Sequence, residues 1–218
     1  MAGDQHRCFC PYFSQSNLDL GRFVVGNFGK GETNILLLLI GTSSSGKTTL
    51  ARALQAALPD YWQYLSLDMF FSGVPPQYGG GANGPLGALG FCYENKATDA
   101  SISYGTIGEQ VLLGMISSAI AFVNDGTNLI FDDMILDESH AAIWRNALND
   151  IDSTTVHLSA PIGLLTSRNK VRNNPPRLPY NHIAANKILA AELSLDSGEM
   201  TVEDCVAEVA RHLRNCSQ

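Results

Sequence analysis

Short apolar runs alternate with amphipathic stretches along this chain from residue 34 onward. The strand-like runs occupy 34–40, 62–68, 127–132, 154–160 and 192–196. Stretches with apolar residues every three or four positions, which predict helices, lie at 47–58, 106–124, 138–149, 161–173, 181–191 and 201–214. This alternation predicts an α/β fold, a three-layer sandwich with a five-stranded parallel sheet between helices. The apolar strand NILLLLI agrees, because parallel strands are buried on both faces.

Two segments interrupt the alternation. Residues 73–105 are rich in Gly, Pro, Ala and Tyr, and a connection of this length is typical of a lid or a substrate-binding wall, with a surface insertion as the alternative. The second segment, NNPPRLPY at 173–180, has three prolines, which predict a break in helix. Residues 1–33 show no sustained periodicity, so we expect an N-terminal extension followed by one domain over 34–218.

Composition narrows the class of protein. The 218 residues are 45% hydrophobic and 16% charged, as in a soluble globular domain. The net charge of −7 and the absence of a basic run argue against nucleic acid as the principal partner. No apolar run approaches the ~20 residues that cross a bilayer, and the N-terminus lacks a secretory pattern. Together with five scattered cysteines, these features predict a cytoplasmic protein without a membrane partner.

The strongest motif lies between the first strand and the first helix. It fits G-x-x-x-x-G-K-[ST] at every position, and with the next residue it comprises Gly41, Thr42, Ser43, Ser44, Ser45, Gly46, Lys47, Thr48 and Thr49. Backbone N–H groups of such a loop surround a β-phosphate, and its glycines permit the positive φ angles that aim them inward. Lys47 is expected to reach the β- and γ-phosphates and Thr48 to ligate Mg²⁺. The segment therefore predicts binding of a nucleoside triphosphate, with ATP and Mg²⁺ as cofactors.

The guanine-binding signature Asn-Lys-x-Asp of GTPases is missing. Asn169-Lys170 is followed by Val171-Arg172, which places Arg where the carboxylate must meet guanine. Asn186-Lys187 also fails, because Ile188-Leu189 follows it. A GTPase switch is therefore disfavoured. A kinase needs an oriented acceptor hydroxyl, a carboxylate that holds the metal, and positive charge over the transferred group.

Three carboxylates follow predicted strands at the carboxyl edge of the sheet. Asp68 ends the second strand, where it can accept the proton of a substrate hydroxyl; a helix cap and a water-mediated Mg²⁺ contact are the alternatives. Asp132 follows the apolar strand NLIF and fits a carboxylate that holds Mg²⁺. Asp133 points to the opposite side and is expected to face the substrate. A structural capping role stays open for Asp132 and Asp133.

Two arginines supply candidates for the positive charge. Arg168 and Arg172 are four residues apart on one predicted helix and so share a face, from which they could close over the phosphates as a lid. A solvated basic face would have the same pattern. Aromatic residues near the predicted acceptor region suit an apolar or aromatic substrate, with core packing as the alternative; they are Phe70, Phe71, Tyr78, Phe91 and Tyr93.

These motifs resemble those of the chloramphenicol phosphotransferase-like proteins, a family of small P-loop kinases. The likeness covers most of 34–214, in the segments GTSSSGKTTLARALQ, LSLDMFF, LIFDDMIL, IWRNAL, the arginine-bearing segment after VHLSA, and LSLDSGEMTVEDCVAEVARHL. It implies a fold like that of shikimate and adenylate kinases and transfer of the γ-phosphate of ATP to an antibiotic hydroxyl. It also implies Asp68 as general base, Lys47 as phosphate clamp and Arg168 or Arg172 as lid charge. The turn at 196–198 would lie near adenine.

The chain departs from this family where an acceptor would be chosen. The N-terminal extension has no counterpart in the family, and the stretch at 73–90 is richer in Gly and Pro than the family leads us to expect. NNPPRLPY stands where we expect a less proline-rich lid, and Asn186 stands where the family tends to have histidine. We therefore predict an ATP-dependent phosphotransferase that acts on a small-molecule hydroxyl, with the type of acceptor open. The alternatives are a nucleotide-binding regulatory or interaction module and a kinase of a protein or nucleotide acceptor.

Overall fold

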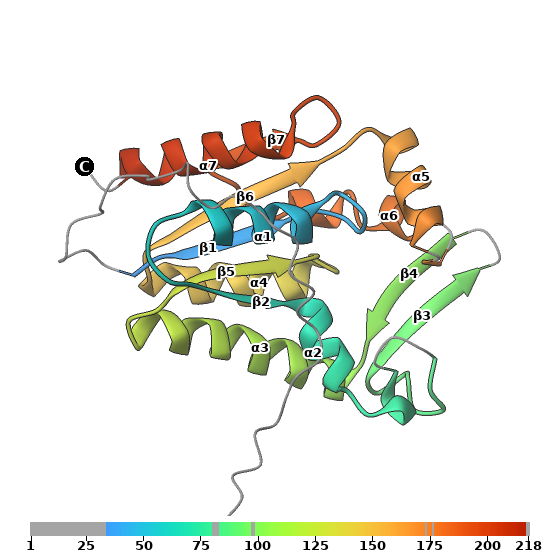
Figure 1. Cartoon of the computed structure of the whole chain (residues 1–218). Helices are drawn as coiled ribbons and strands as arrows, with labels where there is room; N and C mark the ends of the chain where they lie inside the picture. The colour runs from blue at the N-terminus through green and yellow to red at the C-terminus, as the bar shows by residue number, and fades with distance from the viewer. Residues whose placement is uncertain (1–33, 80–82, 97–98, 173, 176, 217–218) are drawn as a thin grey trace, which may run out of the picture.

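A five-stranded parallel sheet forms the centre of the molecule (Figure 1). The computed structural model describes residues 34–79, 83–96, 99–172, 174–175 and 177–216, so the predicted extension at 1–33 lies outside the described residues. The strand order is β2-β5-β1-β6-β7. The strands are β1 (Leu36–Ile40), β2 (Trp62–Ser66), β5 (Asn128–Asp133), β6 (Ser153–Ser159) and β7 (Leu193–Asp196). The predicted sandwich with a five-stranded parallel sheet is confirmed.

Helices cover both faces of the sheet, and Figure 1 shows α1 and α7 on one side and α3 and α4 on the other. These helices are α1 (Lys47–Ala57), α3 (Thr106–Asn124), α4 (Glu138–Ala147) and α7 (Val202–Cys216). All five residues of β1 are fully buried. Leu36, Leu38 and Ile40 pack with residues of α3 and α4, while Leu37 and Leu39 pack with residues of α1 and α7. Strand alternation thus divides one apolar run between two cores.

Helix α3 matches its predicted range and is long and apolar enough to cross a membrane by length and composition alone. Its apolar face, however, includes Leu112, Met115, Ile116 and Ala119, which are buried in the core beside β1 and β5. A single helix of this kind is weak evidence for a membrane span, because core helices have the same composition.

The predicted strand at 62–68 is two residues too long. β2 ends at Ser66, and α2 (Leu67–Gly73) begins at the next residue because the Ser66 hydroxyl accepts a hydrogen bond from Met69 N. Serine is a favoured N-cap, and its side chain satisfies an N–H group that has no partner inside the helix. Asp68 therefore lies in the first turn of α2 rather than at the end of a strand.

The Gly- and Pro-rich segment contains structure that the sequence analysis did not predict. After the short 3-10 turn η1 (Pro76–Tyr78), β3 (Phe91–Lys96) and β4 (Asp99–Tyr104) form an antiparallel two-stranded ribbon. The ribbon is separate from the main sheet and lies beside the end of α6 (Figure 1).

The region after β6 also differs from prediction. The predicted helix at 161–173 is present as α5 (Ile162–Val171), but no single helix covers 181–191. Instead, α6 (Leu178–Asn181) begins inside the proline-rich break and is followed by the 3-10 turn η3 (Ala185–Lys187). Pro179 is tolerated because a residue in the first turn of a helix needs no intrahelical N–H bond. Another 3-10 turn, η2 (Leu148–Asp150), extends α4.

Candidate active site

The P-loop joins β1 to α1, and its two glycines adopt backbone conformations that other residues rarely take. Gly41 has φ +156° and Gly46 has φ +103°. A Cβ atom on Gly41 would lie 2.3 Å from the Leu158 carbonyl oxygen, so this position also requires the absence of a side chain. Helix α1 begins at the residue after Gly46, which points its N-terminal N–H groups into the loop. The geometry of a phosphate cradle is therefore present.

Asp132 at the end of β5 lies against the P-loop side chains. Its Oδ2 atom accepts hydrogen bonds from Thr48 Oγ1 at 2.7 Å and from the Tyr64 hydroxyl at 3.2 Å. Lys47 Nζ lies 3.7 Å from Asp132 Oδ1 and donates to the carbonyl oxygens of Gly41 and Thr42 at 2.8 and 3.1 Å. A hydroxyl and a carboxylate side by side next to a phosphate cradle are the oxygen donors that Mg²⁺ prefers, and they fit its site.

Asp133 lies on the opposite side of β5, as strand alternation predicts, but it does not face a substrate. Its side chain is completely buried and lies beside helix α4. It accepts hydrogen bonds from Trp144 Nε1 and Met134 N, and His140 Nε2 lies 3.1 Å away. Despite burial, the pKa of the Asp133 carboxyl group is lowered, because His140 and these hydrogen bonds favour the charged form. The predicted substrate contact of Asp133 is therefore wrong, because its carboxylate is buried and its partners are groups of the protein itself.

Asp68 lies across a cavity of about 130 Å³ from the P-loop. The same cavity is lined by Lys47, Thr48, Asp132 and Arg172. Burial raises the pKa of the Asp68 carboxyl group and the charge of Asp132 raises it further, while Lys47 and Arg172 oppose both effects. A carboxylate with a raised pKa is a stronger base, and it lies in the cavity where an acceptor could meet a phosphate.

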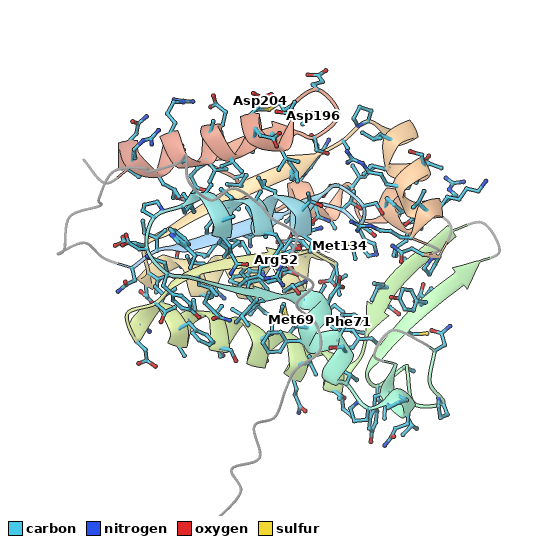
Figure 2. The ribbon with its side chains drawn as sticks, in the orientation of Figure 1. Arg52, Met69, Phe71, Met134, Asp196 and Asp204 are labelled. Atoms are coloured by element: carbon cyan, nitrogen blue, oxygen red, sulfur yellow. The ribbon has the colours of Figure 1, made fainter. Side chains whose placement is uncertain are left out.

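The remaining wall of this cavity is mostly apolar. Phe70 is not among its lining residues: its ring stacks on Phe131 with 6.4 Å between the ring centroids and packs against the core, so its substrate contact stays a prediction. The neighbouring Phe71 lines the cavity instead, and Figure 2 labels it together with Met134. The apolar and aromatic lining residues are Leu67, Phe71, Tyr93, Ile102, Met134 and Leu178.

Tyr93 and Ile102 of this wall come from the β3–β4 ribbon. Tyr93 was among the aromatic residues named from the sequence, whereas nothing singled out Ile102. The alternation in FCYENK and DASISY is a strand signal, but the surrounding glycines and prolines obscure it.

The two predicted lid arginines have different surroundings. Arg168 donates to the Ser197 hydroxyl at 2.8 Å, to the Ser197 carbonyl at 3.1 Å and to the Ser45 carbonyl at 3.4 Å. It therefore ties the P-loop to the turn after β7. Both arginines line a second cavity of about 240 Å³, together with Thr49, Met200 and Val202, but only Arg172 also lines the cavity of Asp68. Arg172 is thus better placed than Arg168 to contact a transferred group.

Asn186, which the sequence marked only as a departure, connects three parts of the site. Its Oδ1 atom accepts from Gly41 N at 3.1 Å and from Ile135 N at 3.0 Å, and its Nδ2 atom donates to the His182 carbonyl at 2.6 Å. Its side chain is 1% exposed. Asn186 belongs to the 178–187 segment, which contains α6 and η3. Its amide therefore holds this segment against both the start of the P-loop and the residues after β5.

Several solved structures with this fold are described as kinases. A sugar kinase from Janibacter sp. HTCC2649 has a TM-score of 0.59 and 16% identity, covering 83% of this chain and 95% of its own. APS kinase from Mycobacterium tuberculosis, in complex with AMPPNP and APS, has a TM-score of 0.54 and 16% identity, covering 84% and 98%. Shikimate kinase from Acinetobacter baumannii, in complex with shikimate, has a TM-score of 0.52 and 16% identity, covering 84% and 95%.

The family comparison is more specific than these structural likenesses. No curated protein shows significant similarity to this chain. The model of the family "chloramphenicol phosphotransferase-like protein" matches residues 33–214, which contain the P-loop, both cavities and all the site residues named above. With this match over most of its length, the chain belongs to the chloramphenicol phosphotransferase-like family and is a phosphotransferase of the P-loop kinase type.

Proposed function

We propose that this enzyme transfers the γ-phosphoryl group of ATP, with Mg²⁺, to a hydroxyl group of a small molecule. The observation that carries the proposal is the cavity in which the P-loop, Asp132, Asp68 and Arg172 meet. A site that only binds nucleotide needs no general base across from its phosphate cradle, whereas transfer to a hydroxyl can use one.

Each side chain has a defined role in this reaction. Asp68 accepts the proton of the acceptor hydroxyl while the oxygen of that hydroxyl forms a bond to the γ-phosphorus. The bond between the γ-phosphorus and the β,γ-bridging oxygen of ATP breaks, and ADP leaves. The P-loop N–H groups and Lys47 bind the phosphates, and Arg172 stabilises the negative charge on the transferred group. Thr48 and Asp132 would hold Mg²⁺, which neutralises phosphate charge when bound. Arg168 instead fixes the P-loop against the turn at Ser197.

The walls of the cavity support an uncharged acceptor. Among the described lining residues the cations are Lys47 and Arg172, and the phosphates would engage both. The opposite wall is mostly apolar, its polar residues Ser66, Tyr93 and Asn174 are uncharged, and its one carboxylate, Asp68, would repel an anionic acceptor. Chloramphenicol belongs among the acceptors to test because of the family to which the chain belongs. If chloramphenicol is the acceptor, the biological role is antibiotic resistance. The need for ATP favours a cytoplasmic location for the enzyme.

The test is a mass-spectrometric transfer assay with Mg·ATP, chloramphenicol and a panel of uncharged hydroxyl compounds and nucleosides. We expect a phosphorylated product with the unaltered enzyme and a loss of roughly 10²-fold or more in rate for Asp68→Asn. Asp60→Asn is the matched control, because it removes the same charge from an exposed residue before β2, at the opposite edge of the sheet, and asparagine tolerates its φ of +68°.

Two results would contradict the proposal. Equal activity of Asp68→Asn and the unaltered enzyme would remove Asp68 as the general base. ATP binding without modification of any acceptor would favour a nucleotide-bound interaction module or a protein acceptor.

A further inference from the structure

The β3–β4 ribbon contributes one cross-strand pair to the acceptor side of the cavity. Tyr93 of β3 is directly opposite Ile102 of β4 in the antiparallel register, and both line the cavity together with Asp68. Residues opposite each other in such a register have side chains on the same face of the ribbon. The pair therefore presents one polar and one apolar side chain to an acceptor bound in the cavity beside Asp68.

The backbone of this pair is held from both outer edges of the ribbon. On the β3 edge, the Asn83 side chain accepts from Tyr93 N at 2.8 Å and donates to the Tyr93 carbonyl at 3.1 Å. On the β4 edge, Ile102 N donates to His182 Nε2 at 3.1 Å. A two-stranded ribbon is only marginally stable in water, so these bonds fix it at the position that faces the cavity.

The Tyr93 hydroxyl is available for recognition. Its phenol makes no hydrogen bond to another described residue, although its ring is half-buried and packs against the core. Burial raises the pKa of Tyr93, and the negative charge of Asp68 raises it further, so the hydroxyl stays protonated and can donate. Half-buried tyrosine hydroxyls usually have a partner, and here the cavity can supply one.

The other side chains of this wall offer less. Leu67, Phe71, Met134 and Leu178 have no hydrogen-bonding group, and the Ser66 hydroxyl already caps α2. Asn174 also lines the cavity, but it belongs to the segment after α5 and not to the ribbon. On the ribbon side of the cavity, Tyr93 is thus the polar group that complements Asp68.

We propose that Tyr93 is an acceptor-specificity residue whose phenol donates a hydrogen bond to a second oxygen of the acceptor, while Asp68 holds the hydroxyl that receives phosphate. Ile102 packs against the apolar frame between the two oxygens. The acceptor class is then an uncharged compound with one reacting hydroxyl and a second hydroxyl or carbonyl oxygen. This inference rests on the proposed phosphotransfer and adds what the acceptor must contain.

The experiment compares pairs of probes that differ by one hydroxyl: 1-phenyl-1,3-propanediol with 3-phenyl-1-propanol, and 1-phenyl-1,2-ethanediol with 2-phenylethanol. Binding to the full chain with Mg·AMPPNP is measured by titration in ligand-observed NMR, and transfer from Mg·ATP by mass spectrometry. The unaltered enzyme is expected to bind at least one diol about 3- to 10-fold more tightly than its partner, the range of one hydrogen bond. Tyr93→Phe should abolish that preference and leave affinity for the mono-alcohol unchanged.

Tyr78→Phe is the matched control, because Tyr78 carries the same hydroxyl on η1 and does not line the cavity. It should keep the preference. The inference is overturned if the two members of each pair bind equally, if the preference survives in Tyr93→Phe, or if no probe binds.

Binding and transfer separate the two proposals. Transfer to diol and mono-alcohol at equal rates and with equal affinity would leave the phosphotransfer standing and overturn the role of Tyr93. Binding that prefers the diol and depends on Tyr93, without any product, would support the role of Tyr93 and count against the phosphotransfer.

Discussion

At the scale of the residue, the neighbouring carboxylates Asp132 and Asp133 have entirely different surroundings. Asp132 contacts Thr48 and Tyr64 at the P-loop, whereas Asp133 is sealed against Trp144 and His140. Strand alternation predicted that the two point apart, and this is confirmed. Trp144 and His140 lie on α4, and the packing of this helix against β5 is a tertiary contact that no local pattern reveals. Strand alternation therefore predicts the direction of the Asp133 side chain but not the residues that surround it.

The raised pKa of Asp68 leads to a prediction about pH. A base must be deprotonated to act, so kcat/KM should fall as the pH drops through the pKa of Asp68, in a range above that of an ordinary aspartate. The positive charge of Arg172 lowers this pKa, so Arg172→Gln should move the acid limb of the profile to higher pH and reduce the rate by roughly 10²-fold. The pH dependence of kcat/KM measures both effects.

Lys170→Gln serves as the control for that profile. Lys170 lies in the last turn of α5, two residues before Arg172, is exposed and lines neither of the two cavities beside the P-loop. Its replacement should leave the acid limb in place. An unchanged limb in Arg172→Gln would mean that Arg172 does not act on the base.

At the scale of the element, the predictable parts are those with an uninterrupted local signal. The β1–P-loop–α1 unit and the whole range of α3 follow from apolar periodicity and the motif. The ribbon was missed because the glycines and prolines around its strands obscure their alternation. The helix predicted at 181–191 is wrong, although Ile183, Ile188 and Leu189 have helical spacing, because the Asn186 amide binds backbone groups of other segments. Such bonds are non-local, so periodicity cannot report them.

Two glycines in different elements should respond to alanine in opposite directions. In Gly41→Ala the new Cβ would meet the Leu158 carbonyl at a backbone angle that alanine disfavours, so we expect a loss of about 1–3 kcal/mol in the free energy of unfolding, with loss of nucleotide binding. In Gly114→Ala, within α3, the Cβ meets nothing within 4 Å, and we expect a gain of about 0.5–1 kcal/mol. Urea unfolding measures both, and changes of the same sign would contradict this account.

At the scale of the whole molecule, the 178–187 segment joins the nucleotide side of the site to the acceptor side. The Thr42 hydroxyl donates to the Pro179 carbonyl, and Asn186 accepts from Gly41 N. The same segment reaches the ribbon, since Asn181 Nδ2 donates to the Ala100 carbonyl at 2.8 Å and His182 accepts from Ile102 N. One short segment therefore contacts the P-loop and the acceptor wall together.

This connection predicts that nucleotide and acceptor strengthen each other's binding. Mg·AMPPNP should raise acceptor affinity by about 5- to 150-fold, and by thermodynamic linkage the acceptor must raise nucleotide affinity by the same factor. Asn186→Ala should reduce both factors equally. Calorimetric titration of each ligand with and without the other gives the two values.

Asn128→Ala controls for the loss of an amide, because Asn128 accepts from Ile35 N at the opposite edge of the sheet. It should leave the coupling unchanged. Coupling of full size in Asn186→Ala would show that the 178–187 segment does not transmit it.

The separateness of the β3–β4 ribbon has a consequence for how this protein can diverge. The ribbon shares no strand pairing with the five-stranded sheet, and it lies in the chain between α2 and α3, away from the P-loop and Asp132. Substitutions in it alter the acceptor wall while the strands that carry the phosphate-binding residues keep their register. Evolution, or directed evolution in the laboratory, can thus exchange one acceptor for another by varying two short strands under an unchanged catalytic scaffold.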